Sequence, residues 1–125
     1  MNKGKTTVKH TILLSCFILI LGCGLKRPSQ EDLKSADYGT YPFKYEEIVK
    51  SHMSKRLFDP YSAVYEFQGL PTQGWQNYFG KIYYGFRGFV YINAKNRMGG
   101  YVGSKLFVYL IKNGQVIFME HSDQE

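Results

Sequence analysis

Cysteine is nearly absent from this chain of 125 residues: the two that occur, Cys16 and Cys23, both lie near its start. A disulfide-stapled scaffold is therefore excluded, because it needs cysteine pairs in the folded part of the chain. Long apolar runs are missing too. The longest, residues 12–21, is about half of the roughly 20 residues that a membrane-spanning helix needs. We therefore expect no transmembrane helix.

Acidic residues are scarcer than basic ones, with 10 Asp and Glu against 16 Lys and Arg, which gives a formal net charge of +6. Such an excess could point to nucleic acid. Three of the basic residues, Lys3, Lys5 and Lys9, nevertheless lie in the first 22 residues, and the remainder carries only +3. Residues 87–91 match the RNP1 motif of RNA-binding domains only in part. We expect no nucleic-acid partner.

The first 22 residues have the pattern of an export signal, with three lysines before the apolar run and the small residue Gly22 after it. Cys23 comes next, and Ile20-Leu21-Gly22-Cys23 resembles the lipobox of bacterial lipoproteins. The resemblance implies cleavage between Gly22 and Cys23 and lipidation of the Cys23 thiol. The alternative is an ordinary signal peptide followed by a chance cysteine.

The residue after the lipobox indicates which membrane holds the lipidated protein. Gly24 stands where an Asp favours retention in the inner membrane of enteric-type bacteria. By resemblance to that sorting rule, we expect a protein anchored by lipid in the cell outer membrane and facing the periplasm, in a host that has an outer membrane.

We expect three regions: a lipoprotein signal peptide at 1–22, the lipidated cysteine and a flexible tether at 23–43, and a small domain at 44–125. The tether contains Pro, Ser, Gly and charged residues without apolar periodicity. A helix is predicted at 45–58, where apolar residues recur every three or four positions. Asp59-Pro60 should end it, because the residue before proline avoids the helical conformation.

Strands and turns are predicted after that helix. The strands are expected at 63–67, 79–94, 105–112 and 115–120, with a loop at 69–74, a turn at 96–100 and a two-residue hairpin at Asn113-Gly114. The expected fold class is α+β: one N-terminal helix packed on a four-stranded antiparallel meander sheet. Strand 79–94 is apolar on both faces. Its tyrosine-rich face is therefore either a partner surface or a partly solvent-exposed side of the sheet.

Residues suited to catalysis are few. No G-x-S-x-G motif occurs, and His52 and His121 are the only histidines after the signal. Glu46 and Glu47 are adjacent on the predicted helix and so diverge. No set of residues has the spacing of a metal site. We expect no enzymatic activity, no metal and no cofactor.

The most distinctive stretch is residues 93–103, Asn-Ala-Lys-Asn-Arg-Met-Gly-Gly-Tyr-Val-Gly. Asn and Gly in this pattern are typical of a shaped turn. The functional interpretation is a polar loop that presents Asn93, Lys95, Asn96 and Tyr101 to a partner. Trp75 is a further candidate, which with Tyr78 and Tyr83 would supply stacking faces for a glycan.

A resemblance in the mature chain rests on residues 45–49, 57–63 and 93–103. Asp59-Pro60-Tyr61-Ser62-Ala63 and residues 93–103 are similar to the D-P-x-S-A and N-A-K-N-x-x-G-G-Y-x-G segments of a group of small proteobacterial lipoproteins and exported proteins. The resemblance covers about 36–116 and implies a lipoprotein but no activity. The chain departs from the group in having no cysteine in its long strand.

We therefore expect a lipid-anchored envelope protein with a non-enzymatic binding or assembly role and an envelope-protein or cell-wall partner. The alternative is a module that binds glycan or peptidoglycan.

Overall fold

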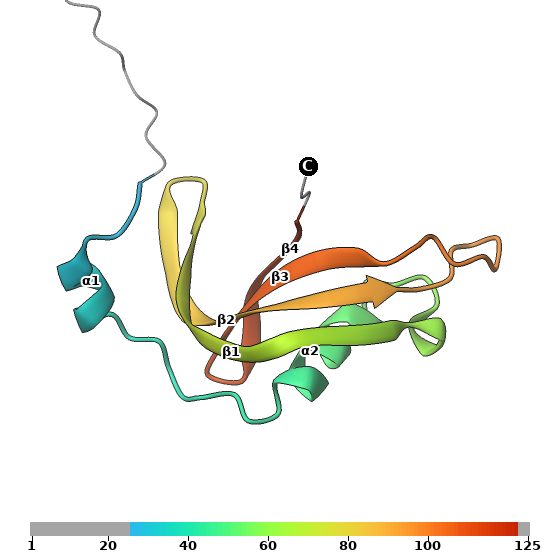
Figure 1. Ribbon diagram of the computed structural model, residues 1–125, viewed down its shortest axis with the longest axis horizontal. Coiled ribbons are helices and arrows are strands. Elements are labelled where there is room, and N and C mark those ends of the chain that lie inside the picture. Colours follow the sequence, from blue (N-terminus) through green and yellow to red (C-terminus); the bar gives the residue numbers. More distant parts are fainter. Residues whose placement is uncertain (1–25, 123–125) are drawn as a thin grey trace, which may run out of the picture.

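The computed structural model describes residues 26–122, so the predicted signal peptide, its cleavage site after Gly22 and the predicted lipidation site Cys23 lie outside the described residues. The elements are α1 (Gln30–Ser35), α2 (Tyr45–Ser54), the short 3-10 helix η1 (Pro60–Ser62), β1 (Val64–Tyr78), β2 (Lys81–Asn93), β3 (Lys105–Lys112) and β4 (Gln115–His121). The strands form one antiparallel sheet in the order β1-β2-β3-β4 (Figure 1). This confirms the α+β class and the four-stranded meander.

The expectation of a single N-terminal helix after a flexible tether is wrong, because α1 lies within the predicted tether. A capping box starts this helix: the Asp32 backbone N–H donates to Ser29 Oγ at 3.1 Å, and the Ser29 backbone N–H donates to Asp32 Oδ2 at 2.9 Å. After α1, aromatic contacts hold the chain to the sheet. The Tyr38 ring lies 5.8 Å from that of Tyr84. Isolated aromatic residues of this kind give no periodic signal in a sequence.

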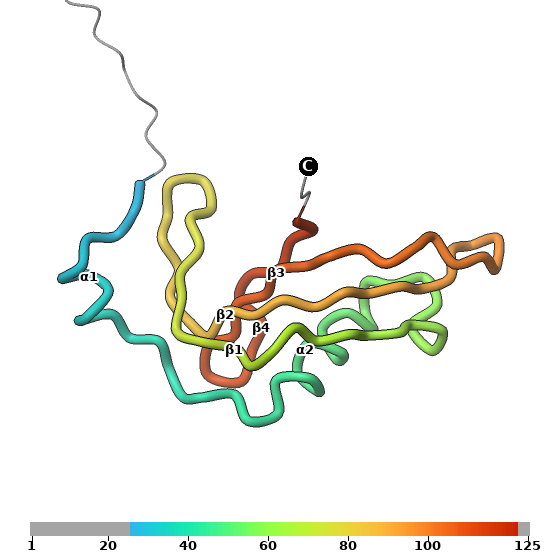
Figure 2. Tube along the Cα trace, viewed as in Figure 1, coloured from blue at the N-terminus to red at the C-terminus, as the bar shows by residue number. Residues whose placement is uncertain are grey.

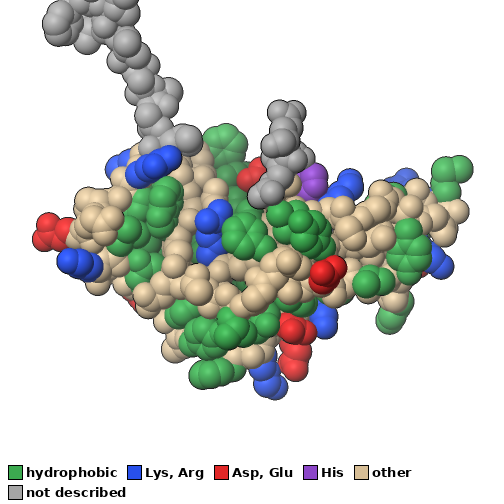
Figure 3. Space-filling view, in the orientation of Figure 1, with side chains coloured by type: hydrophobic (Ala, Val, Ile, Leu, Met, Phe, Trp, Pro, Cys, Tyr) green, Lys and Arg blue, Asp and Glu red, His purple; other side chains and the backbone are tan. Residues whose placement is uncertain are grey.

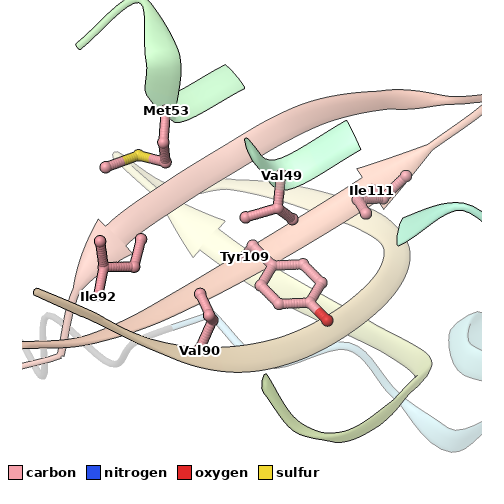
Figure 4. Packing of buried hydrophobic residues seen from close by; sticks show 6 residues of the cluster. All are labelled: Val49, Met53, Val90, Ile92, Tyr109 and Ile111. Atoms are coloured by element: carbon pink, nitrogen blue, oxygen red, sulfur yellow. The ribbon is translucent and has the colours of Figure 1, made fainter. Parts of the chain in front are cut away.

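The core lies between α2 and the sheet. Val49 and Met53 of α2 pack on side chains of β2 and β3 (Figure 4). The sheet residues of this cluster are Val90, Ile92, Tyr109 and Ile111. The predicted helical face is thus confirmed, but α2 ends at Ser54 rather than Phe58. The N–H groups of Arg56 and Leu57 both bond to the Met53 carbonyl, which closes the last turn.

β1 continues through the predicted loop 69–74, so that expectation is wrong. Gln68 pairs with Phe89 and Thr72 pairs with Arg87, which leaves residues 69–71 opposite the single residue Gly88. A bulge of this kind accommodates glycine and proline without ending an edge strand. Pairing with β2 therefore overrides the local turn signal.

Two-residue turns close the β1–β2 and β3–β4 hairpins. Asn113 and Gly114 have φ values of 49° and 76°, as the predicted type I′ turn requires, and β3 has its predicted bounds. The turn between β1 and β2 is Phe79-Gly80, with φ values of 49° and 80°. The predicted start of a strand at Phe79 is therefore wrong, and β2 begins at Lys81. A bulky residue seldom adopts positive φ, so the sequence gives little sign of this turn.

The outer part of the β1–β2 hairpin, residues 74–85, lies beyond the pairing of β2 with β3 and forms an arm that bends away from the rest of the sheet (Figures 1 and 2). The Tyr78 ring near its end lies 5.7 Å from that of Phe118 on β4. Phe118 is paired with Leu110, the neighbour of Tyr109 in β3. Because successive side chains of a strand point to opposite faces, the arm leans over the face that α2 does not cover.

Candidate functional site

Three of the five predicted binding residues, Lys95, Asn96 and Tyr101, lie in the loop between β2 and β3, and a fourth, Asn93, ends β2 directly before this loop. Asn96 Oδ1 accepts hydrogen bonds from the backbone N–H groups of Met98 (2.9 Å) and Gly100 (3.2 Å), and Asn93 Oδ1 accepts one from Gly103 (3.1 Å). The two asparagine side chains therefore use their oxygens to shape the loop. The predicted turn at 96–100 is confirmed by the bond between the Asn96 N–H and the Gly100 carbonyl.

This loop lies against the segment Asp59–Ala63. The Lys95 backbone N–H donates to Ser62 Oγ at 2.9 Å, and Tyr101 Oη donates to the Ser62 carbonyl at 3.0 Å. Asp59 Oδ1 in turn accepts from the Ser62 N–H and caps η1. Two of the segments that carry the sequence resemblance are thus in contact, and Ser62 joins them.

A group of exposed apolar side chains, here called the apolar end, surrounds this junction. Its members are Phe58, Tyr61, Met98, Tyr101 and Val102. Tyr61 is fully exposed and Met98 is 93% exposed. The Lys95 ammonium lies 5.5 Å from the ring centre of Tyr101, and the Arg97 guanidinium 5.8 Å from that of Phe58. Figure 3 shows hydrophobic and basic side chains together at this end of the molecule. Such patches on soluble domains mark interaction sites.

Trp75, the fifth predicted residue, lies elsewhere. It pairs with Tyr84 in the arm, whereas Asn93 ends β2. Strand rise over that stretch corresponds to roughly 30 Å, so Trp75 and the loop do not form one site. Of the other two proposed stacking residues, Tyr83 carries the Lys81 ammonium 4.9 Å above its ring, and Tyr78 contacts Phe79 and Phe118.

Trp75 lines a cleft of about 890 Å³ between the arm and the segment around α1. The cleft wall contains Arg27, Leu33, Lys34, Ala36 and Tyr38 from the segment, residues 72–77 from β1, and Arg87 and Phe89 from β2. A volume of this size is typical of ligand sites. The sequence gives no sign of this cleft, because one of its walls is the segment predicted to be a tether.

The hairpin tip, defined as Tyr78, Phe79 and Gly80, lies next to the start of the described chain. Asn77 Nδ2 donates to the Lys26 carbonyl at 2.9 Å, and Phe79 is 91% exposed. The closeness of Lys26 to the tip has no counterpart in the sequence, because the bond spans 51 positions.

The titratable groups are dispersed. Within residues 26–122, no three His, Cys, Asp or Glu side chains are placed to hold a metal ion. Partial burial, with Arg56 and Lys55 nearby, lowers the pKa of His52. The His121 ring lies 5.6 Å from that of Phe107. No helix of this part of the chain is long and apolar enough to cross a membrane.

Comparisons with protein families, with curated proteins and with solved structures found no match to this chain. The resemblance to small proteobacterial lipoproteins therefore stays a prediction.

Proposed function

We propose that this chain is a non-enzymatic binding protein, held by lipid on Cys23 at the periplasmic face of the outer membrane, that presents its apolar end to another envelope protein. The observation that carries the proposal is the position of the apolar end. It lies at the far end of the molecule from Lys26, where the described chain begins (Figures 1 and 2). A surface so placed would face away from the anchor.

The opposite end suits a membrane. Cys23 precedes Lys26 by three positions, and three extended residues span about 11 Å at most. A lipid on Cys23 would therefore keep the hairpin tip close to the bilayer, since Lys26 is bonded to Asn77 beside it. Phe79 offers an apolar ring to the interface, and Lys81 follows it with a positive charge.

Site-specific crosslinking tests the partner surface. A photoreactive amino acid in place of Met98 should capture one envelope protein, identified by mass spectrometry. The same group in place of the exposed Gln115, which lies in the β3–β4 hairpin, should not. Lys95→Gln together with Tyr101→Ala should reduce the adduct. Equal capture from both positions would refute a partner site at the apolar end.

Labelling with an alkyne-tagged fatty acid tests the anchor. The native chain should incorporate the label, and Cys23→Ser should not. Labelling that persists in Cys23→Ser would refute lipidation at this residue.

A second candidate function is glycan binding in the cleft, and the position of Trp75 in its wall favours it. Only one of the three proposed stacking residues lies there, so we rank it below protein binding. Purified sacculi should sediment the native chain but not Trp75→Ala if this function holds.

A further inference from the structure

β1 is an edge strand, since it is paired with β2 alone. Six consecutive residues of β1, 72–77, line the cleft. Successive side chains of a strand point to opposite faces of the sheet, so a cleft that touches only one face would meet alternate residues. The unbroken run indicates that the cleft follows the free backbone edge of β1.

The backbone along this edge has no other partner. Within residues 26–122, the backbone groups of 72–77 form no backbone hydrogen bonds beyond those of the β1–β2 ladder. Near the end of this run, the Asn77 side chain donates a hydrogen bond to the Lys26 carbonyl. An exposed row of strand N–H and C=O groups is a template for an added strand.

Arg87 gives the cleft a charge preference. The charged lining residues of the cleft are Arg27, Lys34 and Arg87, and no Asp or Glu of residues 26–122 lines it. Arg87 is half-buried, and its Nε is buried without a hydrogen-bond partner in the described part of the chain. Its guanidinium lies 5.1 Å from the ring centre of Phe89. An arginine so placed is suited to a carboxylate, which it can bind through two parallel hydrogen bonds.

Gly74 makes room for that arginine. A Cβ at Gly74 would lie 2.8 Å from Arg87 Cβ and 3.3 Å from its Cδ. The absence of a side chain therefore lets the stem of Arg87 lie across β1 toward the cleft.

Trp75 and Arg87 lie on opposite faces of the β1–β2 hairpin. Trp75 is paired with Tyr84 and Thr72 with Arg87, and residues 72 and 75 are an odd number of positions apart. A strand added to β1 would direct alternate side chains to these two faces. Apolar side chains would meet Trp75, and acidic ones would meet Arg87.

We propose that the cleft binds an extended peptide that alternates apolar and acidic residues and adds as a strand to the free edge of β1. This inference rests on the proposed role as a binding protein. It concerns a different surface from the apolar end, so the peptide site and the proposed partner site can be refuted separately.

The probe is a fluorescein-labelled peptide of about eight residues that alternates valine and glutamate. Fluorescence anisotropy with the full chain in detergent should show saturable binding. The matched valine–lysine peptide should not bind. A valine–glutamate peptide methylated at alternate backbone nitrogens should also lose binding, because it cannot complete the strand ladder.

Arg87→Gln should weaken binding of the probe by about tenfold or more, and Arg87→Lys by less. Lys95→Gln in the apolar end should leave it unchanged. Thermal unfolding would show that each variant is folded. If Arg87→Gln does not fold, Arg87→Lys is used to measure the loss of binding. Absence of saturable binding, or binding that survives alternate methylation, overturns the inference. Peptidoglycan fragments that bind where the peptide does not would also overturn it and would favour the glycan candidate. Capture of a partner through Met98 would be unaffected by either result.

Discussion

Tyr101 Oη donates a hydrogen bond to the carbonyl oxygen of Ser62 at 3.0 Å and so fastens the β2–β3 loop to the turn before β1. The ring of the same tyrosine is half exposed in the apolar end. Tyr101 therefore has two separable parts, a hydroxyl that holds the loop and a ring that is available to a partner.

Tyr101→Phe separates these parts. Loss of one exposed hydrogen bond should lower the free energy of unfolding by about 1 kcal/mol or less. Amide hydrogen exchange in residues 96–103 should become faster, while crosslinking from Met98 persists because the ring remains. Loss of crosslinking with unchanged exchange would instead mean that the hydroxyl itself contacts the partner.

Gly88→Ala should destabilise the fold strongly. Gly88 is paired with Tyr109, and a Cβ at Gly88 would collide with the phenol oxygen and ring of that tyrosine. Overpacking of this kind costs about 1–3 kcal/mol, measurable by urea unfolding. Gly100→Ala is the matched control. A Cβ at Gly100 meets nothing within 4 Å, so that change should alter stability by about 0.5 kcal/mol at most. Equal effects of the two substitutions would contradict this packing.

Tyr109→Phe should not destabilise the protein. The side chain is fully buried in the core (Figure 4), and its hydroxyl has no hydrogen-bond partner. Removing a buried unpaired hydroxyl relieves a desolvation penalty of about 1–3 kcal/mol. We expect an equal or higher Tm in thermal unfolding. A clear fall in Tm would show that the hydroxyl is bonded in solution.

The same residue sets a pH dependence. Burial, with Tyr45, Tyr41 and Glu46 nearby, raises the pKa of Tyr109 in the folded state. The unfolded chain loses this proton from about pH 10 upward, while the folded chain keeps it. The free energy of unfolding should therefore fall above that pH, by about 1.4 kcal/mol per unit from this group. Tyr45, Tyr65 and Tyr84 also have a raised pKa, so the test is the difference between the native chain and Tyr109→Phe. Parallel pH profiles would argue against the contribution of Tyr109.

A fluorescence experiment tests the membrane-facing end. The chain has one tryptophan, so Trp75→Phe gives a silent background. In that background, Phe79→Trp in the lipid-anchored protein on vesicles with brominated acyl chains should be quenched. Met98→Trp, at the opposite end and equally exposed, should not be. Quenching at both positions, or only at residue 98, would reverse the proposed orientation.

Local patterns predicted the elements that local forces specify. The apolar stripe of α2, the Asn113-Gly114 turn and the bounds of β3 all follow from periodicity and turn chemistry and are confirmed. The local pattern predicts a loop at 69–74 where the structure has a bulge at 69–71, because glycine and proline mark turns unless a neighbouring strand holds them in register. Phe79-Gly80 was missed because phenylalanine seldom adopts positive φ.

The predicted binding residues show the same difference between what local pattern predicts and what contacts within the fold add. The sequence points to residues 93–103 as a distinctive loop. It does not show that Asn93 and Asn96 use their side-chain oxygens for hydrogen bonds within that loop. The sequence also could not show that Ser62 joins this loop to the segment 59–63.

An α+β meander follows from residue patterns along the chain, as does the placement of its only cysteines, Cys16 and Cys23, in the predicted signal and at the predicted anchor. Long-range contacts are needed for three further features. The segment predicted to be a tether forms one wall of a cleft, β1 keeps an edge unpaired among residues 26–122, and Lys26 lies beside the hairpin tip. These features arise from contacts between segments far apart in the chain. Their energies depend on pairing and packing partners, which no local pattern of residues specifies.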